Sequence, residues 1–124
     1  MQTTATRVTG IDATYYTVKD LVGCTDFYTK VLGLEPSMAV PDFISEWTFE
    51  DGSSFGLYKS EHGNGHGGSA MFHVADVAQG AAHLKELGAL GMHGGEDYSE
   101  FETCFMAFAQ DPEGNQFILH KRKE

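Results

Sequence analysis

The stretch Thr103–His120 reads TCFMAFAQDPEGNQFILH, with two apolar runs on either side of a short polar segment. Pro112 fixes the backbone φ at an early position of a turn, while Gly114 and Asn115 tolerate the positive φ that a tight reversal requires. The apolar runs are rich in aromatic and branched residues, which favour strands. They cover Cys104–Ala109 and Gln116–His120. The stretch therefore predicts a β-hairpin.

A weaker copy of this hairpin pattern lies earlier in the chain, around the turn Asp51-Gly52. Its two arms are Glu46–Glu50 and Ser54–Lys59. Alignment of the two turn glycines makes Gly56 the counterpart of Ile118. This repetition indicates a chain built from two similar halves.

Each half also contains one segment with the apolar spacing of a helix. Leu21–Leu32 follows Asp20, a capping residue, and ends before Gly33. Val77–Leu87 follows Asp76 and ends before Gly88. The remaining expected strands are Ala13–Lys19, Leu34–Val40, Ser69–Ala75 and Gly91–Gly95. Both halves thus follow the plan β-α-β-β-β.

The loops are marked by composition. Prolines at positions 36 and 41 indicate that the strand over Leu34–Val40 is short or lies at a sheet edge. Glu61–Gly68 is rich in glycine and Glu96–Glu102 in acidic residues, so both are expected as loops. The sequence predicts one α+β domain over residues 1–124, with module 1 at about 11–60 and module 2 at about 69–121.

Length, charge and cysteine content narrow the function. A chain of 124 residues has room for one core, and a net charge of −10 argues against nucleic acid as a partner. No apolar run is long enough to span a membrane, and the first residues lack the pattern of a signal peptide. Cys24 and Cys104 are expected as buried, reduced thiols. Together these features favour a cytoplasmic location.

The segment from Val18 to Gly33, V-x-D-L-x(5)-F-Y-x(3)-L-G, and the turn D-P-E-G-N at Asp111–Asn115 resemble the vicinal oxygen chelate superfamily. This superfamily includes glyoxalase I, extradiol dioxygenases, fosfomycin-resistance proteins and bleomycin-binding proteins. The resemblance extends from Tyr16 to His120. It implies paired βαβββ modules whose mixed sheets curl round a cavity, frequent homodimers, and a cavity that is completed in some members across the subunit contact.

Metal enzymes of this superfamily hold a divalent ion with ligands on the first and last strands of each module. Counting from the matching motifs places those ligand positions at Ala13, Gly56, Ser69 and Ile118, or at Leu57 in place of Gly56 if the strand slips by one residue. Only Ser69 has a polar side chain, and a lone hydroxyl is a poor ligand. The resemblance therefore implies that the inherited metal site is absent, so no metal and no cofactor are expected.

Strand alternation shows which side chains share a face with these positions. The candidate ligand-binding residues are Ala13, Tyr15, Gly56, Tyr58, Ser69, Met71, His73, Ile118 and His120. The set is mostly apolar and aromatic, with a few hydrogen-bonding groups, and suits a planar organic molecule that is neutral or cationic. Gly56 and Ala13 are expected to leave space where a metal and its substrate would sit.

Several of these residues have two interpretations. His73 and His120 are candidate acid–base or ligand-contacting groups, and equally strand histidines with a structural role. The aromatic residues Tyr15, Tyr16, Trp47, Phe49 and Phe55 are either a ligand cage or ordinary sheet core. His62 and His66 have a spacing that suits a metal only on a helix, whereas His83 and His93 are expected at the surface.

Three functions remain open. The first is a metal-free module that binds or sequesters a small organic molecule, as bleomycin-resistance proteins do. The second is a glyoxalase-like lyase or dioxygenase-like enzyme with a divalent-metal site rebuilt around His73 and His120. The third is a protein with a collapsed cavity that acts through its interfaces. Whether the chain is an enzyme is left open, and a homodimer is expected because the sheets have unprotected edges.

Overall fold

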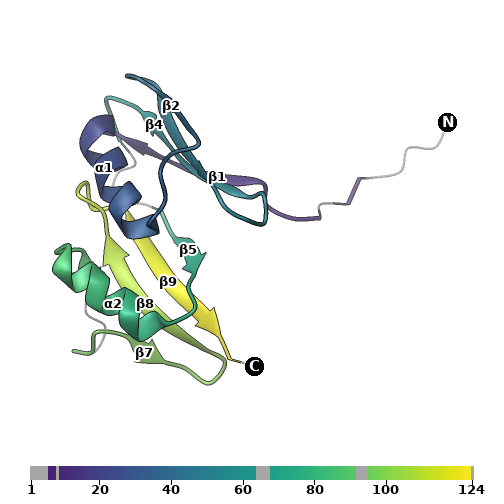
Figure 1. Ribbon diagram of the computed structural model, residues 1–124, viewed down its shortest axis with the longest axis vertical. Coiled ribbons are helices and arrows are strands. Elements are labelled where there is room, and N and C mark those ends of the chain that lie inside the picture. The colour runs from purple at the N-terminus through teal and green to yellow at the C-terminus, as the bar shows by residue number, and fades with distance from the viewer. Residues whose placement is uncertain (1–5, 8, 64–67, 92–94, 124) are drawn as a thin grey trace.

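The computed structural model describes residues 6–7, 9–63, 68–91 and 95–123. It has two separate β-sheets, each with one helix against one face (Figure 1). The first sheet has the strand order β1-β4-β3-β2, and the second has the order β5-β9-β8-β6, with β7 also paired to β8. The elements of the first half are β1 (Ala13–Val18), α1 (Leu21–Leu32), β2 (Met38–Val40), β3 (Ile44–Thr48) and β4 (Ser54–Lys59). Those of the second half are β5 (Ala70–His73), α2 (Val77–Glu86), β6 (Leu90–Gly91), β7 (Ser99–Glu100), β8 (Cys104–Gln110) and β9 (Gln116–Arg122).

The predicted duplication is confirmed at the level of strand register. In the first sheet β1 runs parallel to β4 and pairs Tyr15 with Gly56, and in the second β5 runs parallel to β9 and pairs Met71 with Ile118. The turn glycines also match, since Gly52 has φ 89° and Gly114 has φ 84°. The α+β architecture of two equivalent modules is therefore as expected.

Both helices begin and end by the predicted means. The Asp20 carboxylate accepts a hydrogen bond from the Gly23 amide, and Gly33, with φ 67°, donates its amide to Thr29. The Asp76 carboxylate caps α2 through the Gln79 amide. This helix is one residue shorter than predicted because Leu87 is its C-cap residue.

The strands differ from the prediction where short-range pattern is weak. Nine strands are described rather than eight, because the acidic segment expected as a loop contains β7, which pairs with Met106 and Phe105. Of the predicted strand Gly91–Gly95, Gly91 lies in β6, while 92–94 fall outside the described residues. The strand predicted from Leu34 is short and lies at the edge of the first sheet, as its prolines indicated.

The prediction of a positive φ for Asn115 is wrong, since Asp42 is the sole residue other than glycine with a positive φ in the described ranges. Asn115 is buried, and both its backbone amide and its side-chain amide donate to Asp111, each at 2.9 Å. Its polar side chain therefore stabilises the turn through a buried carboxylate rather than through backbone conformation.

An aromatic cluster fills the space between α1 and the first sheet, whereas α2 buries the aliphatic residues Val77, Ala81 and Leu84. Tyr28 is fully buried and packs against Trp47, Phe55 and Phe117, which come from both halves of the chain. The cysteines Cys24 and Cys104 are free and buried, as expected. No helix in the described ranges is long and apolar enough to cross a membrane.

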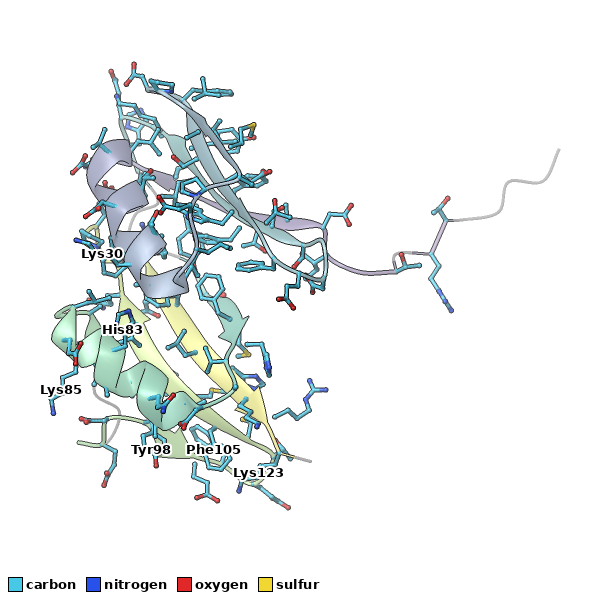
Figure 2. The ribbon with its side chains drawn as sticks, in the orientation of Figure 1. Lys30, His83, Lys85, Tyr98, Phe105 and Lys123 are labelled. Atoms are coloured by element: carbon cyan, nitrogen blue, oxygen red, sulfur yellow. The ribbon has the colours of Figure 1, made fainter. Side chains whose placement is uncertain are left out.

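Several polar contacts between described residues join the two halves. The Tyr28 hydroxyl donates to the Asp111 carboxylate at 2.9 Å, and the Glu113 carboxylate accepts from the backbone amides of Lys19 and Asp20 at the start of α1. His83 of α2 lies 2.9 Å from the carbonyl oxygen of Lys30 in the last turn of α1 (Figure 2). The relative placement of the two sheets therefore depends on hydrogen bonds as well as on the core.

Candidate functional site

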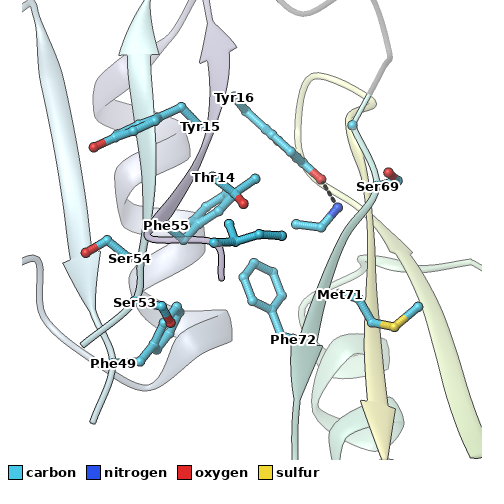
Figure 3. Close-up of a pocket in the computed structure, with 13 residues that line it drawn as sticks. Thr14, Tyr15, Tyr16, Phe49, Ser53, Ser54, Phe55, Ser69, Met71 and Phe72 are labelled. Carbon is cyan, nitrogen blue, oxygen red and sulfur yellow. Dashed lines mark hydrogen bonds between the residues drawn. The ribbon is translucent and has the colours of Figure 1, made fainter. Parts of the chain in front are cut away.

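A cleft of about 610 Å³ lies between the first sheet and β5 of the second sheet. Figure 3 shows its two sides, with Tyr15 and Tyr16 of β1 on one side and Phe72 of β5 on the other. Ile11, Phe49, Phe55, Ala70 and Met71 add to the apolar lining. Aliphatic hydroxyl groups come from Thr14, Ser53, Ser54 and Ser69, in addition to the phenol groups of the two tyrosines. No charged side chain is among the described residues that line it.

The aromatic side chains at the base of the cleft hold one another in place. Phe55 packs edge-to-face against Tyr16, with ring centroids 5.2 Å apart, and against Phe72, at 5.1 Å. The Tyr16 hydroxyl accepts from the Ala70 amide at 2.6 Å and donates to the Gln116 carbonyl oxygen at 2.5 Å. Burial raises the pKa of Tyr16, so the hydroxyl keeps its proton for this contact. The cleft is therefore preformed.

Tyr15 lies at the edge of the cleft, on the open face of the first sheet. Its hydroxyl donates a hydrogen bond to the Glu46 carboxylate, and its ring lies 4.9 Å from that of Tyr58. The bond to Glu46 and partial burial raise the pKa of Tyr15 to about 12, because the carboxylate stabilises the neutral phenol and repels the phenolate. This edge therefore combines an aromatic surface with one negative charge.

The space expected above Gly56 does not exist. A Cβ atom on Gly56 would lie 2.4 Å from Cε1 of Tyr15, because the ring of Tyr15 lies across the cross-strand glycine. The prediction of a hollow at this position is wrong, since it considered the missing side chain and not the neighbour that occupies its place. The open space lies beside Tyr15 instead.

The structure brings together only part of the predicted ligand-binding set. Tyr15, Ser69 and Met71 line the cleft. Ser69 also lines a second hollow of about 280 Å³ on the second sheet, together with Ile118. The other predicted residues line neither space: Ala13, Gly56, Tyr58, His73 and His120. The aromatic candidates are divided as well, because Tyr16, Trp47 and Phe55 are core residues whereas Tyr15 is exposed.

His73 and His120 are Cα partners on the parallel strands β5 and β9, so both face the same side of the second sheet. His73 is exposed and His120 is half-buried. Neither imidazole is hydrogen-bonded or ion-paired to another residue of the described ranges. His83 is exposed as predicted, while His66 and His93 lie outside the described residues, so the pair His62 and His66 has no described geometry.

The inherited metal-ligand positions do not offer a ligand set. They provide a methyl group at Ala13, a hydrogen at Gly56, a hydroxyl at Ser69 and a hydrocarbon at Ile118. Within the part of the chain that the structure describes, no three side chains of His, Cys, Asp or Glu are grouped to hold an ion. The groups at these four positions do not fit the divalent metal ion that the resemblance implies.

Two kinds of site residue were missed by the sequence analysis. Thr14 and Phe72 alternate toward the core, and they reach the cleft because β1 and β5 do not pair across the junction of the sheets. No pattern within a single strand signals such a junction. Glu46 could have been identified from the sequence, because the turn at Gly52 sets the register that pairs it with Gly56 beside Tyr15.

Solved structures share this fold at low sequence identity. A lactoylglutathione lyase from Agrobacterium tumefaciens is 19% identical, with a TM-score of 0.75 over 92% of this chain and 94% of that one. A glyoxalase/bleomycin resistance protein from Catenulispora acidiphila is 16% identical, with a TM-score of 0.66 over 90% and 97%. An integron cassette protein from the mobile metagenome of V. cholerae is 18% identical, with a TM-score of 0.73 over 94% and 98%. At these identities the similarity shows the fold alone.

The curated proteins contain no match to the chain. A family model does match it over residues 10–119, which include both modules and the cleft. The matching model describes the Glyoxalase/Bleomycin resistance protein/Dioxygenase superfamily, in agreement with the strand register and the two equivalent halves. The chain therefore belongs to the glyoxalase/bleomycin resistance protein/dioxygenase superfamily.

Proposed function

We propose that this protein binds a small organic molecule in the cleft between its two sheets, without a metal ion, in the manner of a bleomycin-resistance or glyoxalase-like binding protein. The observation that carries the proposal is the chemistry of the cleft. It has aromatic and aliphatic walls, four aliphatic and two phenolic hydroxyl groups, and no charged lining side chain among the described residues. Ligand pockets have this composition of mainly apolar walls with a few polar groups.

The class of ligand follows from the walls. Flat rings such as Tyr15 and Phe72 favour a planar aromatic partner, because stacked and edge-to-face contacts add to the burial of apolar surface. A phosphate or carboxylate would lose its hydration without gaining a positive partner in the described lining. Glu46 at the edge and the net charge of −10 permit a positively charged substituent outside the cleft.

The test uses the neutral fluorophore N-phenyl-1-naphthylamine, whose emission rises in an apolar site. Saturable binding to the purified chain is expected, and Thr14→Trp, which fills the cleft, should weaken it at least about tenfold. Gln79→Ala, an exposed side chain on α2, is the control and should leave binding unchanged. Circular dichroism establishes that each variant is folded. Equal affinity in Thr14→Trp and the parent chain would refute the cleft as the site, and Met71→Ala provides an independent second variant.

A second candidate function rests on His73 and His120, which lie side by side on the second sheet with no partner among the described residues. In that case the protein is a glyoxalase-like lyase or a dioxygenase-like enzyme with a divalent metal at a rebuilt site. The two imidazoles provide two ligands, and the described residues offer no third from His, Cys, Asp or Glu. The binding function is therefore preferred.

Metal analysis separates the two candidates. Protein purified without a metal-affinity tag is expected to contain no stoichiometric Ni, Zn, Fe or Mn. About one tightly held ion per chain, lost in both His73→Ala and His120→Ala, would favour the enzyme instead. A cytoplasmic location is also part of the proposal, supported by two cysteines that are free and buried.

A further inference from the structure

The cleft has a neighbour of different chemistry. The second hollow, of about 280 Å³, lies at one end of the second sheet and is lined by Phe108, Gln110, Gln116 and Ile118, among others. Ser69, just before β5, lines both the cleft and this hollow. The two spaces therefore meet at one residue, whose side chain is a small hydroxymethyl group.

The two glutamines form a matched pair. They are Cα partners at the turn end of the hairpin of β8 and β9, so their side chains lie on the same face of adjacent antiparallel strands. Both are exposed, and neither side-chain amide is hydrogen-bonded to another residue of the described ranges. Each amide offers two donor hydrogens and a carbonyl acceptor.

The chemistry of the second hollow favours an amide group. A carboxamide has one acceptor and one donor edge, and a glutamine amide can satisfy both at once. Phe108 and Ile118, partners on neighbouring strands, provide apolar contact for a hydrocarbon linker. A carboxylate would meet no positive side chain in the described lining, so its desolvation would be uncompensated.

We propose that the cleft and the second hollow form one two-part site for a neutral molecule that has an aromatic group in the cleft and an amide-bearing arm that passes over Ser69 to the glutamine pair. This inference rests on the proposed function, because the aromatic group is bound as described above. It adds the chemical class of the ligand and a direction for its second part.

The test compares three probes by isothermal titration calorimetry. The first is 1-methylnaphthalene, which has no arm. The second is a series of naphthalenes with short, medium and long methylene linkers that end in a carboxamide. The third is the same series ending in a methyl ketone, which keeps the acceptor and the size but has no donor. For the best linker, the amide is expected to bind about tenfold more tightly than the ketone.

Four substitutions locate the effect. Gln116→Leu should remove the advantage of the amide over the ketone, whereas Gln79→Leu, an exposed glutamine on α2, should preserve it. Ser69→Phe should block the arm, so that the amide and 1-methylnaphthalene bind with similar affinity. Gln110→Leu is a second variant with the same expectation as Gln116→Leu.

The outcomes separate this inference from the proposed function. Binding of 1-methylnaphthalene with no gain from any amide arm would overturn the two-part site and leave the cleft as the binding site. An amide advantage that survives both Gln116→Leu and Gln110→Leu, or that survives Ser69→Phe, would also overturn it. Failure of every probe to bind would overturn both proposals.

Discussion

At the scale of single residues, the contact between Tyr15 and Glu46 gives a titration that can be measured. The carboxylate holds the pKa of Tyr15 at about 12, above its ordinary value of 10.0. Glu46→Gln removes the negative charge, so the transition of this phenol should move toward pH 10, as followed by phenolate absorbance. Tyr15→Phe should remove the transition. A titration curve that is identical in the parent chain and in Glu46→Gln would contradict the contact.

The same contact should also make the free energy of unfolding depend on pH. Because the folded chain has the higher pKa, the favourable contribution is complete below the ordinary pKa of a tyrosine and is lost as pH rises through about 12. Stability against urea should therefore fall more steeply above pH 10 in the parent chain than in Tyr15→Phe. Parallel pH curves for the two proteins would contradict this linkage.

An added methyl group at Gly56 should destabilise the fold. Its Cβ would lie 2.4 Å from a ring atom of Tyr15 and 3.1 Å from the Ser45 carbonyl oxygen, so Gly56→Ala must displace the ring. A loss of about 1–3 kcal/mol in the free energy of unfolding is expected. Gly10→Ala, where nothing lies within 4 Å, is the matched control. Equal unfolding midpoints in urea would show that the ring moves away freely.

At the scale of elements, the turn of the last hairpin depends on a buried carboxylate. Asp111 is 5% exposed and accepts hydrogen bonds from Tyr28, Asn115 and the amide of Glu113. Tyr28→Phe removes one of these donors and should reduce the free energy of unfolding by about 1–3 kcal/mol. Tyr58→Phe on the open face should have little effect, because no described residue bonds to its hydroxyl. Similar losses in both variants would argue against the buried contact.

Local signals were sufficient for most elements but not for the weakly patterned ones. Capping residues and apolar spacing located α1 to the residue, and the glycine turns located β4 and the hairpin of β8 and β9. β7 was missed because Ser99 and Glu100 have no strand-like pattern and become a strand only by pairing with β8. Such pairing is a tertiary effect that outweighs local preference.

The candidate site was less predictable for the same reason. Strand alternation grouped Tyr15 with Ala13 and Tyr58 with Gly56, and the register of β1 and β4 places both groups on one face of the first sheet. It does not show how two sheets meet, and the cleft lies at that junction, where Tyr16 and Phe72 from the core side become lining residues. Nor does it show that the ring of Tyr15 covers Gly56.

At the scale of the whole molecule, the open faces and edges of the sheets predict self-association. Tyr15, Met38, Val40 and Phe43 are exposed on or beside the first sheet, and β2 is an edge strand. An apolar face and a free edge are commonly covered by a partner. We therefore expect a homodimer at micromolar concentration, measured by light scattering. Val40→Asp should shift the mass toward the monomer, with Val22→Asp on the exposed side of α1 as the control. A monomer mass for the parent chain would refute this expectation.

The contact between Glu113 and the start of α1 has a consequence for how the chain is made. Lys19 and Asp20 emerge from the ribosome early, whereas the carboxylate that accepts their amide hydrogens belongs to the last hairpin. A growing chain therefore holds its first helix with those two amides bonded only to water until nearly all of the second half has been synthesised. The first module therefore gains this contact late, after the last hairpin has been translated, although its own helix is translated first.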